Sequence, residues 1–173
     1  MTGNVAQAAQ ARTASVVELA QELIRRPSRA GIDVYGPVLA VLEGWLAARR
    51  LPHRRLHDAA GDVVGLLVEI GGGRPGSWWT LDACVDTAPY GDETAWSFPP
   101  ACGDVVDGWL RGRGAADSKL AAAMFCHIAA DLAPGPPTSP AGSPCCWTWM
   151  STPAASVAPA PTSPTRTRPA PPG

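Results

Sequence analysis

The chain has 173 residues and a formal net charge of −1, and at about 150 residues per domain this length predicts a single domain. The balanced charge and the lack of basic clusters interleaved with aromatic residues argue against a nucleic-acid partner. No run approaches the roughly 20 apolar residues of a membrane span, and residues 1–15 lack the apolar centre of a signal peptide. We therefore predict a cytoplasmic protein without a membrane partner.

The N-terminal third is predicted to be helical. Residues 1–14 are polar and rich in alanine, and we expect a flexible N-terminus there. Apolar residues at helical spacing predict a first helix over residues 16–24. A second helix is predicted to follow Asp33 as its N-cap, with Pro37 in its first turn and an end at Arg50.

Strands are predicted in the middle of the chain. Residues 62–70 and 77–85 are apolar runs joined by the glycine-rich residues 71–76. That connector could cradle a phosphate, but no helix follows it and no Gly-Lys-Ser/Thr ends it, so a hairpin turn is favoured. A short strand over residues 105–110 and a helix over residues 116–132 complete the predicted ordered part, residues 15–132.

The composition changes after Leu132. Twelve of the nineteen prolines fall within residues 133–173, mixed with Ala, Ser, Thr and Gly. Proline lacks a main-chain N–H and fixes φ, so such a segment does not sustain helices or sheet ladders. We predict a disordered Pro/Ala/Thr-rich tail over residues 133–173.

Two segments carry candidate site residues. Cys84 and Asp86 are two positions apart at the end of a predicted strand, so their side chains should project to the same face. The alternative is a buried cysteine and an aspartate that caps a turn. In the second segment, glycines at 112 and 114 allow a tight backbone, and Asp117 opens a predicted helix, where it could serve as a cap.

Together these segments resemble one family. The pattern Asp-Thr-x-Pro-x-Gly-Asp begins at Asp86, and Asp-Gly-Trp-Leu-x-Gly-Arg-Gly-x-x-Asp-x-Lys begins at Asp107; Trp96 and Pro99-Pro100 lie between them. This order and spacing is similar to the co-catalytic zinc metallopeptidases that include acetylornithine deacetylase, succinyl-diaminopimelate desuccinylase, aminoacylase and glutamate carboxypeptidase. The resemblance extends over residues 16–132, the first third of a typical member. It implies an incomplete zinc-peptidase-like three-layer α/β domain with a disordered C-terminal tail.

The resemblance also implies roles for five residues. Asp117 would bridge two zinc ions, which lower the pKa of a shared water and polarise the substrate carbonyl. Asp86 would belong to the catalytic set as the carboxylate that orients the first metal ligand. Cys84 stands where the family has a histidine ligand, and a thiolate can also bind zinc. Arg113 and Lys119 would support the site without binding metal. A small N-acyl amino acid or a peptide would be the substrate, and the family's dimerisation domain would be absent.

Other potential ligands are assigned to structural roles. His53 and His57 flank two arginines in a predicted connector or edge strand and are expected to be solvated. His127, which follows Cys126 in the last predicted helix, is expected to pack in the core. Cys145 and Cys146 are adjacent, which suits neither a chelating pair nor an easy disulfide.

The base of the resembled family is missing. It is a glutamate in an Asp-Glu-Glu stretch some thirty residues beyond the bridging aspartate, whereas here no carboxylate follows Asp131. Read one base back, the codons of residues 146–151 give Leu, Asp, then Leu, Met or Val, then Asp, and Glu where the serine codon begins with AG. We therefore expect a frameshift between Ala133 and Cys145 that replaced the remaining catalytic and dimerisation domains with out-of-frame sequence.

Two functions follow as hypotheses. The first is a metal-dependent hydrolase of amide or peptide bonds, of the deacylase or carboxypeptidase type, present as a truncated and weakly active or inactive fragment. Loss of a general base alone removes about 10²–10⁴-fold in rate. The alternative is a small non-catalytic α/β binding module whose proline-rich tail offers Pro-x-x-Pro spacings to a partner.

Overall fold

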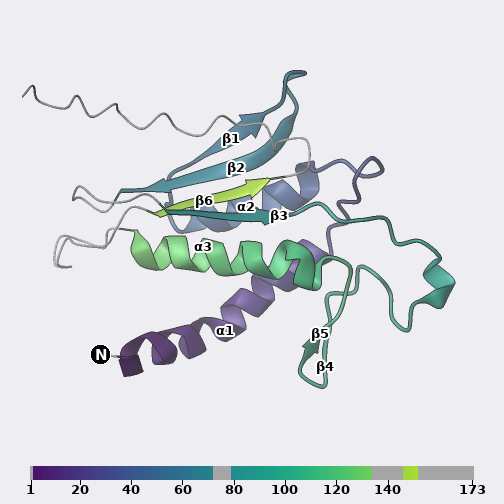
Figure 1. The fold of residues 1–173 in the computed structure, drawn as a ribbon, viewed down its shortest axis with the longest axis horizontal. Coiled ribbons are helices and arrows are strands. Elements are labelled where there is room, and N and C mark those ends of the chain that lie inside the picture. Colours follow the sequence, from purple (N-terminus) through teal and green to yellow (C-terminus); the bar gives the residue numbers. More distant parts are fainter. Residues whose placement is uncertain (1, 72–78, 134–145, 152–173) are drawn as a thin grey trace, which may run out of the picture.

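The computed structural model describes residues 2–71, 79–133 and 146–151. Its main elements are a four-stranded sheet and three α-helices (Figure 1). The helices are α1 (Thr2–Ile24), α2 (Gly36–Ala48) and α3 (Leu120–Leu132). The strands of the sheet are β1 (His53–His57), β2 (Val63–Ile70), β3 (Trp79–Cys84) and β6 (Cys146–Ser151). Shorter elements are η1 (Glu93–Ala95), β4 (Val105–Val106), β5 (Trp109–Leu110) and η2 (Ala115–Lys119).

The sheet order is β1-β2-β6-β3, which corrects two predictions. β6 lies between β2 and β3, antiparallel to β2 and parallel to β3, so the two earlier strands do not form the expected hairpin. β6 also places six residues of the predicted disordered tail in a strand. Its sequence, Cys-Trp-Thr-Trp-Met-Ser, is free of proline and glycine and rich in residues that favour strands. The rest of the predicted tail lies outside the described residues.

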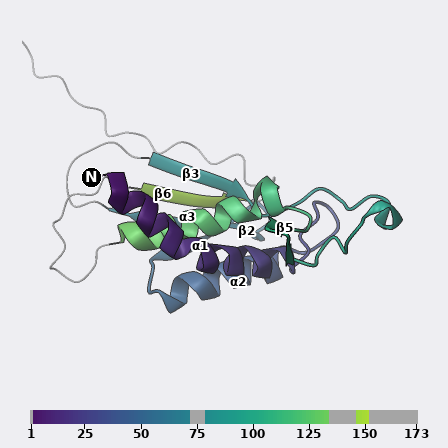
Figure 2. The same ribbon diagram turned by 90° about the horizontal axis from the view of Figure 1, so that it is seen from below.

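The helices lie on the same side of the sheet (Figure 2). Alternate residues of β2, namely Leu66, Val68 and Ile70, are buried in one apolar cluster with side chains of all three helices. This alternation is the pattern of a strand with one face against a helix layer. The helical members of the cluster are Leu19, Ala20, Leu23, Val38, Leu39, Leu42, Leu46, Ala122, Ala123, Cys126 and Ala129. The predicted α/β class is confirmed.

Helix α1 begins at Thr2, whereas residues 1–14 were predicted to be flexible. The early residues are mostly Ala, Gln and Arg, which have high helix propensity. Two contacts hold this part of the helix to α3. Arg12 forms an ion pair of 2.6 Å with Asp131, and Ser15 Oγ lies 2.9 Å from His127 Nε2. Among the described helices, none combines the length and apolar character needed to cross a membrane.

Helix α2 starts two residues later than expected. Its N-cap is Tyr35, and Pro37 occupies the first turn as predicted. Asp33 does not cap the helix, because its carboxylate is bonded to Arg29 instead.

The segment predicted as one strand over residues 105–110 is a small hairpin formed by β4 and β5. Asp107 and Gly108 form its turn with φ values of 53° and 79°. Both central residues therefore have positive φ, as in the type I′ turns that Asp-Gly pairs favour.

The helix predicted over residues 116–132 begins at Leu120, because the backbone of Asp117 and Ser118 is not helical. The peptide bond between these two residues is cis.

Candidate active site

The two segments singled out in the sequence meet at one end of the sheet. Beyond β3 the exposure alternates: Cys84 is exposed, Val85 buried, Asp86 half-buried and Thr87 buried. Ser118 Oγ donates a hydrogen bond of 2.8 Å to the main-chain oxygen of Cys84. This bond joins residues 112–119, called the glycine-rich segment from here on, to the end of β3. This contact brings Cys84 and Asp86 into the neighbourhood of Asp117.

The segment after α1 closes the other flank of the β3 end. Ser28 Oγ donates to the Val85 main-chain oxygen at 2.6 Å. The main-chain N–H of Thr87 donates to Ser28 O, and the N–H of Ala30 donates to Thr87 O, both at 2.9 Å. Ser28 is completely buried, so residues 28–30 form an inner support for residues 85–87.

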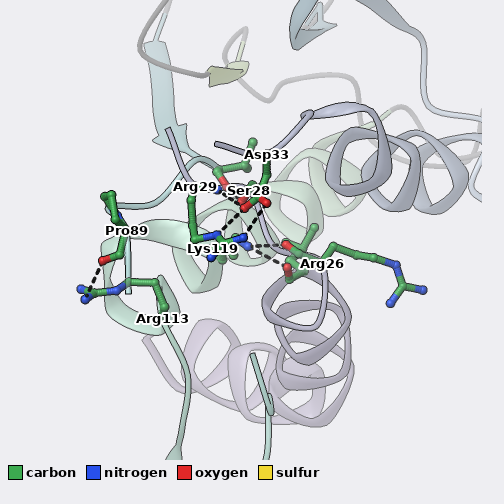
Figure 3. Close-up of polar contacts among 9 residues, drawn as sticks. Arg26, Ser28, Arg29, Asp33, Pro89, Arg113 and Lys119 are labelled. Atoms are coloured by element: carbon green, nitrogen blue, oxygen red, sulfur yellow. Dashed lines mark hydrogen bonds and ion pairs between the residues drawn. The ribbon is translucent and has the colours of Figure 1, made fainter. Parts of the chain in front are cut away.

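Lys119 is a buried cation that joins the glycine-rich segment to the C-terminal end of α1 (Figure 3). Its side chain is only 1% exposed, and Nζ donates to the main-chain oxygens of Leu23 and Arg26 at 2.9 and 2.8 Å. Leu23 lies in the last turn of α1 and Arg26 lies two residues beyond its end, a place where a positive charge is favourable. Burial lowers the pKa of Lys119 to about 8, and the charges of Asp33 and Asp86 oppose that change.

Asp86 is influenced by charges of both signs. Burial raises the pKa of its carboxyl above the ordinary value, the negative charge of Asp117 raises it further, and the positive charge of Lys119 lowers it. Among the described residues, Asp86 Oδ1 is buried without a hydrogen-bond partner. An unpaired buried acceptor is costly, so this oxygen marks a place where a donor or cation would be stabilised.

Arg113 contacts the loop that follows β3. Its Nη2 donates to the main-chain oxygen of Pro89 at 3.2 Å (Figure 3), and the guanidinium lies 5.0 Å from the ring centroid of Trp96. Trp96 Nε1 in turn donates to the main-chain oxygen of Tyr90 at 2.9 Å. Within the described ranges, Arg113 Nε is buried without a partner. Arg113 therefore supports the loop of residues 89–96.

An ion pair that the sequence reasoning missed lies beside Lys119 (Figure 3). Arg29 donates to Asp33 through its main-chain N–H and two guanidinium nitrogens, at 2.7 to 2.9 Å. The guanidinium also lies 4.6 Å from the ring centroid of Tyr90. The hydrogen bonds from Arg29 lower the pKa of Asp33 to about 2. The spacing of four residues between opposite charges was the available signal.

The three histidines lie elsewhere in the described part of the chain, and Cys145 lies outside the described residues. His53 and His57 bound the edge strand β1, and His53 Nδ1 contacts the main-chain oxygen of Leu51 at 2.9 Å. His127 is buried in the core, with its ring centroid 4.6 Å from that of Trp45. Burial raises the pKa of the neighbouring Cys126 thiol to about 12.

The alternative prediction, that Asp117 caps the last helix, is wrong. The N-cap of α3 is Lys119, and no side chain bonds to the cap. Asp117 is exposed, two residues before that cap, and close enough to Asp86 for its charge to raise the pKa of that carboxyl.

These residues fit a metal centre only in part. A thiolate and a carboxylate are donors that zinc accepts, and the orphaned Asp86 oxygen lies close by. However, in the part of the chain that the structure describes, no group of three or more His, Cys, Asp or Glu side chains is placed to hold one ion. The residues present therefore do not fit a pair of metal ions, and no chemical step is assigned to one.

No protein-family model matches the chain, but the chain is similar in sequence to curated proteins. The chain is 39% identical over 112 residues to succinyl-diaminopimelate desuccinylase of Parvibaculum lavamentivorans, covering 63% of the chain and 27% of that enzyme. For the desuccinylase of Rhodopseudomonas palustris the identity is 40% over 123 residues, covering 69% and 30%. The chain matches the N-terminal part of this metallopeptidase family. It spans less than a third of the length of these curated relatives.

Solved structures show a related fold. Human carnosine dipeptidase 1 aligns with a TM-score of 0.62 and 17% identity, over 87% of this chain and 34% of that one. An M20 family metallo-carboxypeptidase from Sulfolobus solfataricus aligns with a TM-score of 0.59 and 15% identity, over 79% and 30%. The predicted metallopeptidase-like α/β fold is confirmed.

Proposed function

We propose that this chain carries part of the active site of a metal-dependent hydrolase that cleaves amide or peptide bonds, of the deacylase or carboxypeptidase type. The observation that carries the proposal is the meeting of Cys84 and Asp86 with the Asp117 segment, through the Ser118 to Cys84 hydrogen bond. This juxtaposition lies in the region related to desuccinylases. We further propose a small N-acyl amino acid or peptide as substrate and a cytoplasmic setting.

The proposed roles follow the positions of the residues. Cys84 and Asp117 would be zinc ligands, Asp86 would orient the ligand at position 84, and Arg113 and Lys119 would hold the surrounding backbone. Zinc bound in such enzymes lowers the pKa of a water molecule and polarises the carbonyl under attack. Two ligands do not complete such a centre, so we propose that this chain by itself is weakly active or inactive.

We also propose that residues after about Ala133 are out-of-frame sequence. The sheet supports this proposal, because the register pairs Ser151 of β6 with Cys84 and Met150 with Ala83. In the shifted frame, the Met150/Ser151 junction encodes Glu when the serine codon begins with AG, and the Trp149/Met150 junction encodes Asp. The two carboxylates would then fall beside residues 82–84, next to the position where the missing base and ligand are needed.

Sequencing the gene from the codon of Leu132 onward tests this proposal. We expect the frame one base back to stay open and to encode further Glu, Asp and His residues. The restored-frame protein should then hydrolyse N-acyl amino acids in the presence of zinc, and the present chain should not. A shifted frame that closes within a few codons would overturn the proposal and favour the non-catalytic binding module with a genuine tail.

Calorimetric titration of the present chain with zinc tests the ligand assignment. We expect at most one weakly bound ion per chain, with binding lost in Asp117→Ala and Cys84→Ser. Asp131→Ala, which removes a surface carboxylate paired with Arg12 away from the site, is the matched control and should bind as the parent does. Binding that persists in Asp117→Ala would contradict the assignment.

A further inference from the structure

We propose that Ser28 is a positioning residue of the site, because it fixes the main chain on both sides of Asp86. It acts through the carbonyl of Val85 and the peptide of Thr87. The inference concerns the site of the proposed function. Its tests use the metal-free chain, so they do not depend on whether zinc binds.

The main chain leaves the sheet at this point. The pairing of β3 with β6 ends at Cys84, so residues 85–87 are beyond the last ladder position in the described part of the chain. Their hydrogen bonds come from the segment after α1: Ser28 Oγ to Val85 O at 2.6 Å, and Thr87 N–H to Ser28 O at 2.9 Å. Buried main-chain groups need such partners. Ser28 therefore supplies one donor and one acceptor to the two residues that flank Asp86.

The position of the Asp86 carboxylate depends on this backbone. The Asp86 side chain is half-buried, and its Oδ1 has no hydrogen-bond partner among the described residues. Because no hydrogen bond of Oδ1 fixes the carboxylate independently, the side chain follows its main chain when the peptide shifts. The Ser28 hydroxyl thereby determines where the carboxylate lies relative to Asp117.

A second serine holds the preceding carbonyl from the opposite segment. Ser118 Oγ donates to Cys84 O at 2.8 Å, and Ser28 Oγ donates to Val85 O. Consecutive carbonyls of the strand end are thus held by two elements distant in sequence. Ser28 is completely buried and Ser118 is partly exposed, so the buried bond is expected to contribute more to the geometry.

Ser28→Ala tests the proposal, with Ser15→Ala as the matched control. Ser15 also bonds through Oγ, to His127 Nε2 at 2.9 Å, but it joins α1 to α3 outside the candidate site. The readouts are amide hydrogen exchange at Thr87 and the alkylation rate of Cys84, an exposed thiol located by peptide mass spectrometry. We expect Ser28→Ala to speed Thr87 exchange about fivefold beyond any global change, which equals about 1 kcal/mol, the net value of one hydrogen bond. The alkylation rate of Cys84 should change together with the exchange rate of Thr87.

The control and the conservative variant separate positioning from general stability. Ser15→Ala should lower the free energy of unfolding. It should not change the alkylation rate of Cys84, and it should not change the exchange of the Thr87 amide beyond the effect of global unfolding. Ser28→Thr keeps the hydroxyl and should restore both readouts. Equal effects of the two alanine variants at Thr87 and Cys84, or no effect of Ser28→Ala, would overturn the proposal.

A more conservative substitution is used if Ser28→Ala does not fold. Ser28→Cys has a side chain of similar size with a weak donor. Faster amide exchange at Thr87 in this variant supports the proposal, and unchanged exchange overturns it. Since zinc is absent from all of these measurements, their failure would leave the hydrolase proposal intact. Failure of the zinc titration would likewise leave the role of Ser28 intact.

Discussion

Lys119 Nζ lies 2.9 Å from the main-chain oxygen of Leu23, ninety-six positions earlier in the chain, in a place with 1% exposure. A second bond to Arg26 O makes this ammonium the link between the end of α1 and the glycine-rich segment. Each carbonyl would be left without this donor if the side chain were apolar, at a cost of about 1–3 kcal/mol per buried group. We therefore expect Lys119→Met to lower the free energy of unfolding by about 2 kcal/mol at pH 7, measured by urea denaturation.

The same variant has an expected pH dependence. The pKa of Lys119 is about 8 in the folded chain and 10.5 in the ordinary case. Between these values the unfolded chain binds more protons, so the contribution of Lys119 to stability rises with pH through this window. A neutral amine still has two N–H donors for its two carbonyls. The stability difference between parent and Lys119→Met should thus grow between pH 7 and pH 10, by on the order of 2 kcal/mol. A constant difference would contradict the burial of a charged lysine.

The Arg29–Asp33 pair also contributes more to stability as the pH rises, but in an acidic window. Arg29 lowers the pKa of Asp33 to about 2 from 3.8, so the stability from this pair is fully present above about pH 4 and is lost as the pH falls toward 2. Asp33→Asn should therefore destabilise the chain at pH 7 and have little effect near pH 2, as judged by thermal unfolding. Glu43→Gln, which breaks a more exposed bidentate pair with Arg55, is the control and should have a smaller effect at pH 7. Equal losses in the two variants would show that the burial of the Arg29–Asp33 pair contributes nothing.

Local pattern was sufficient for part of this fold. Helical spacing located α2 and α3 to within a few residues, and the i, i+2 rule placed Cys84 and Asp86 on one side of the strand end. The turn at Asp107 and Gly108 was also readable, since an Asp-Gly pair between apolar residues is a hairpin signal. The early residues of α1 carried a helix signal too, in their alanine content.

Long-range pairing was not readable in the same way. β6 pairs with strands that end more than sixty positions earlier, and its local sequence lies among prolines that argue for disorder. The resemblance gave Lys119 a supporting role, but its buried contacts and the role of Ser28 were hidden for a related reason. A lysine is rarely buried, and a serine after a proline is typical of a turn. Only the packing of η2 against the end of α1, and of residues 28–30 against residues 85–87, places carbonyls within reach of these side chains.

Two glycines offer a test of how closely the glycine-rich segment packs. Gly112 has a φ of 141°, and a Cβ built there would lie 2.3 Å from Ile24 Cγ2 and 3.2 Å from the main-chain oxygen of Pro100. Gly44, in the middle of α2, has no atom within 4 Å of its Cβ position. Gly112→Ala should therefore destabilise the chain by about 2 kcal/mol or more, through strain and overpacking. Gly44→Ala should stabilise it by about 0.5–1 kcal/mol, because alanine favours the helix.

Urea denaturation of both glycine variants checks this expectation in one experiment, because the chemical change is identical and only the surroundings differ. The Gly112→Ala loss should also speed amide exchange at Ala115 and Lys119, whose N–H groups bond to Gly112 O and Gly114 O. Gly44→Ala should leave those amides unchanged relative to global unfolding. Opposite signs of the two stability changes would show that the end of α1 limits the space around Gly112. A neutral or stabilising Gly112→Ala would mean that the segment before Asp117 is not held against Ile24, and that Lys119 anchors it without this close contact.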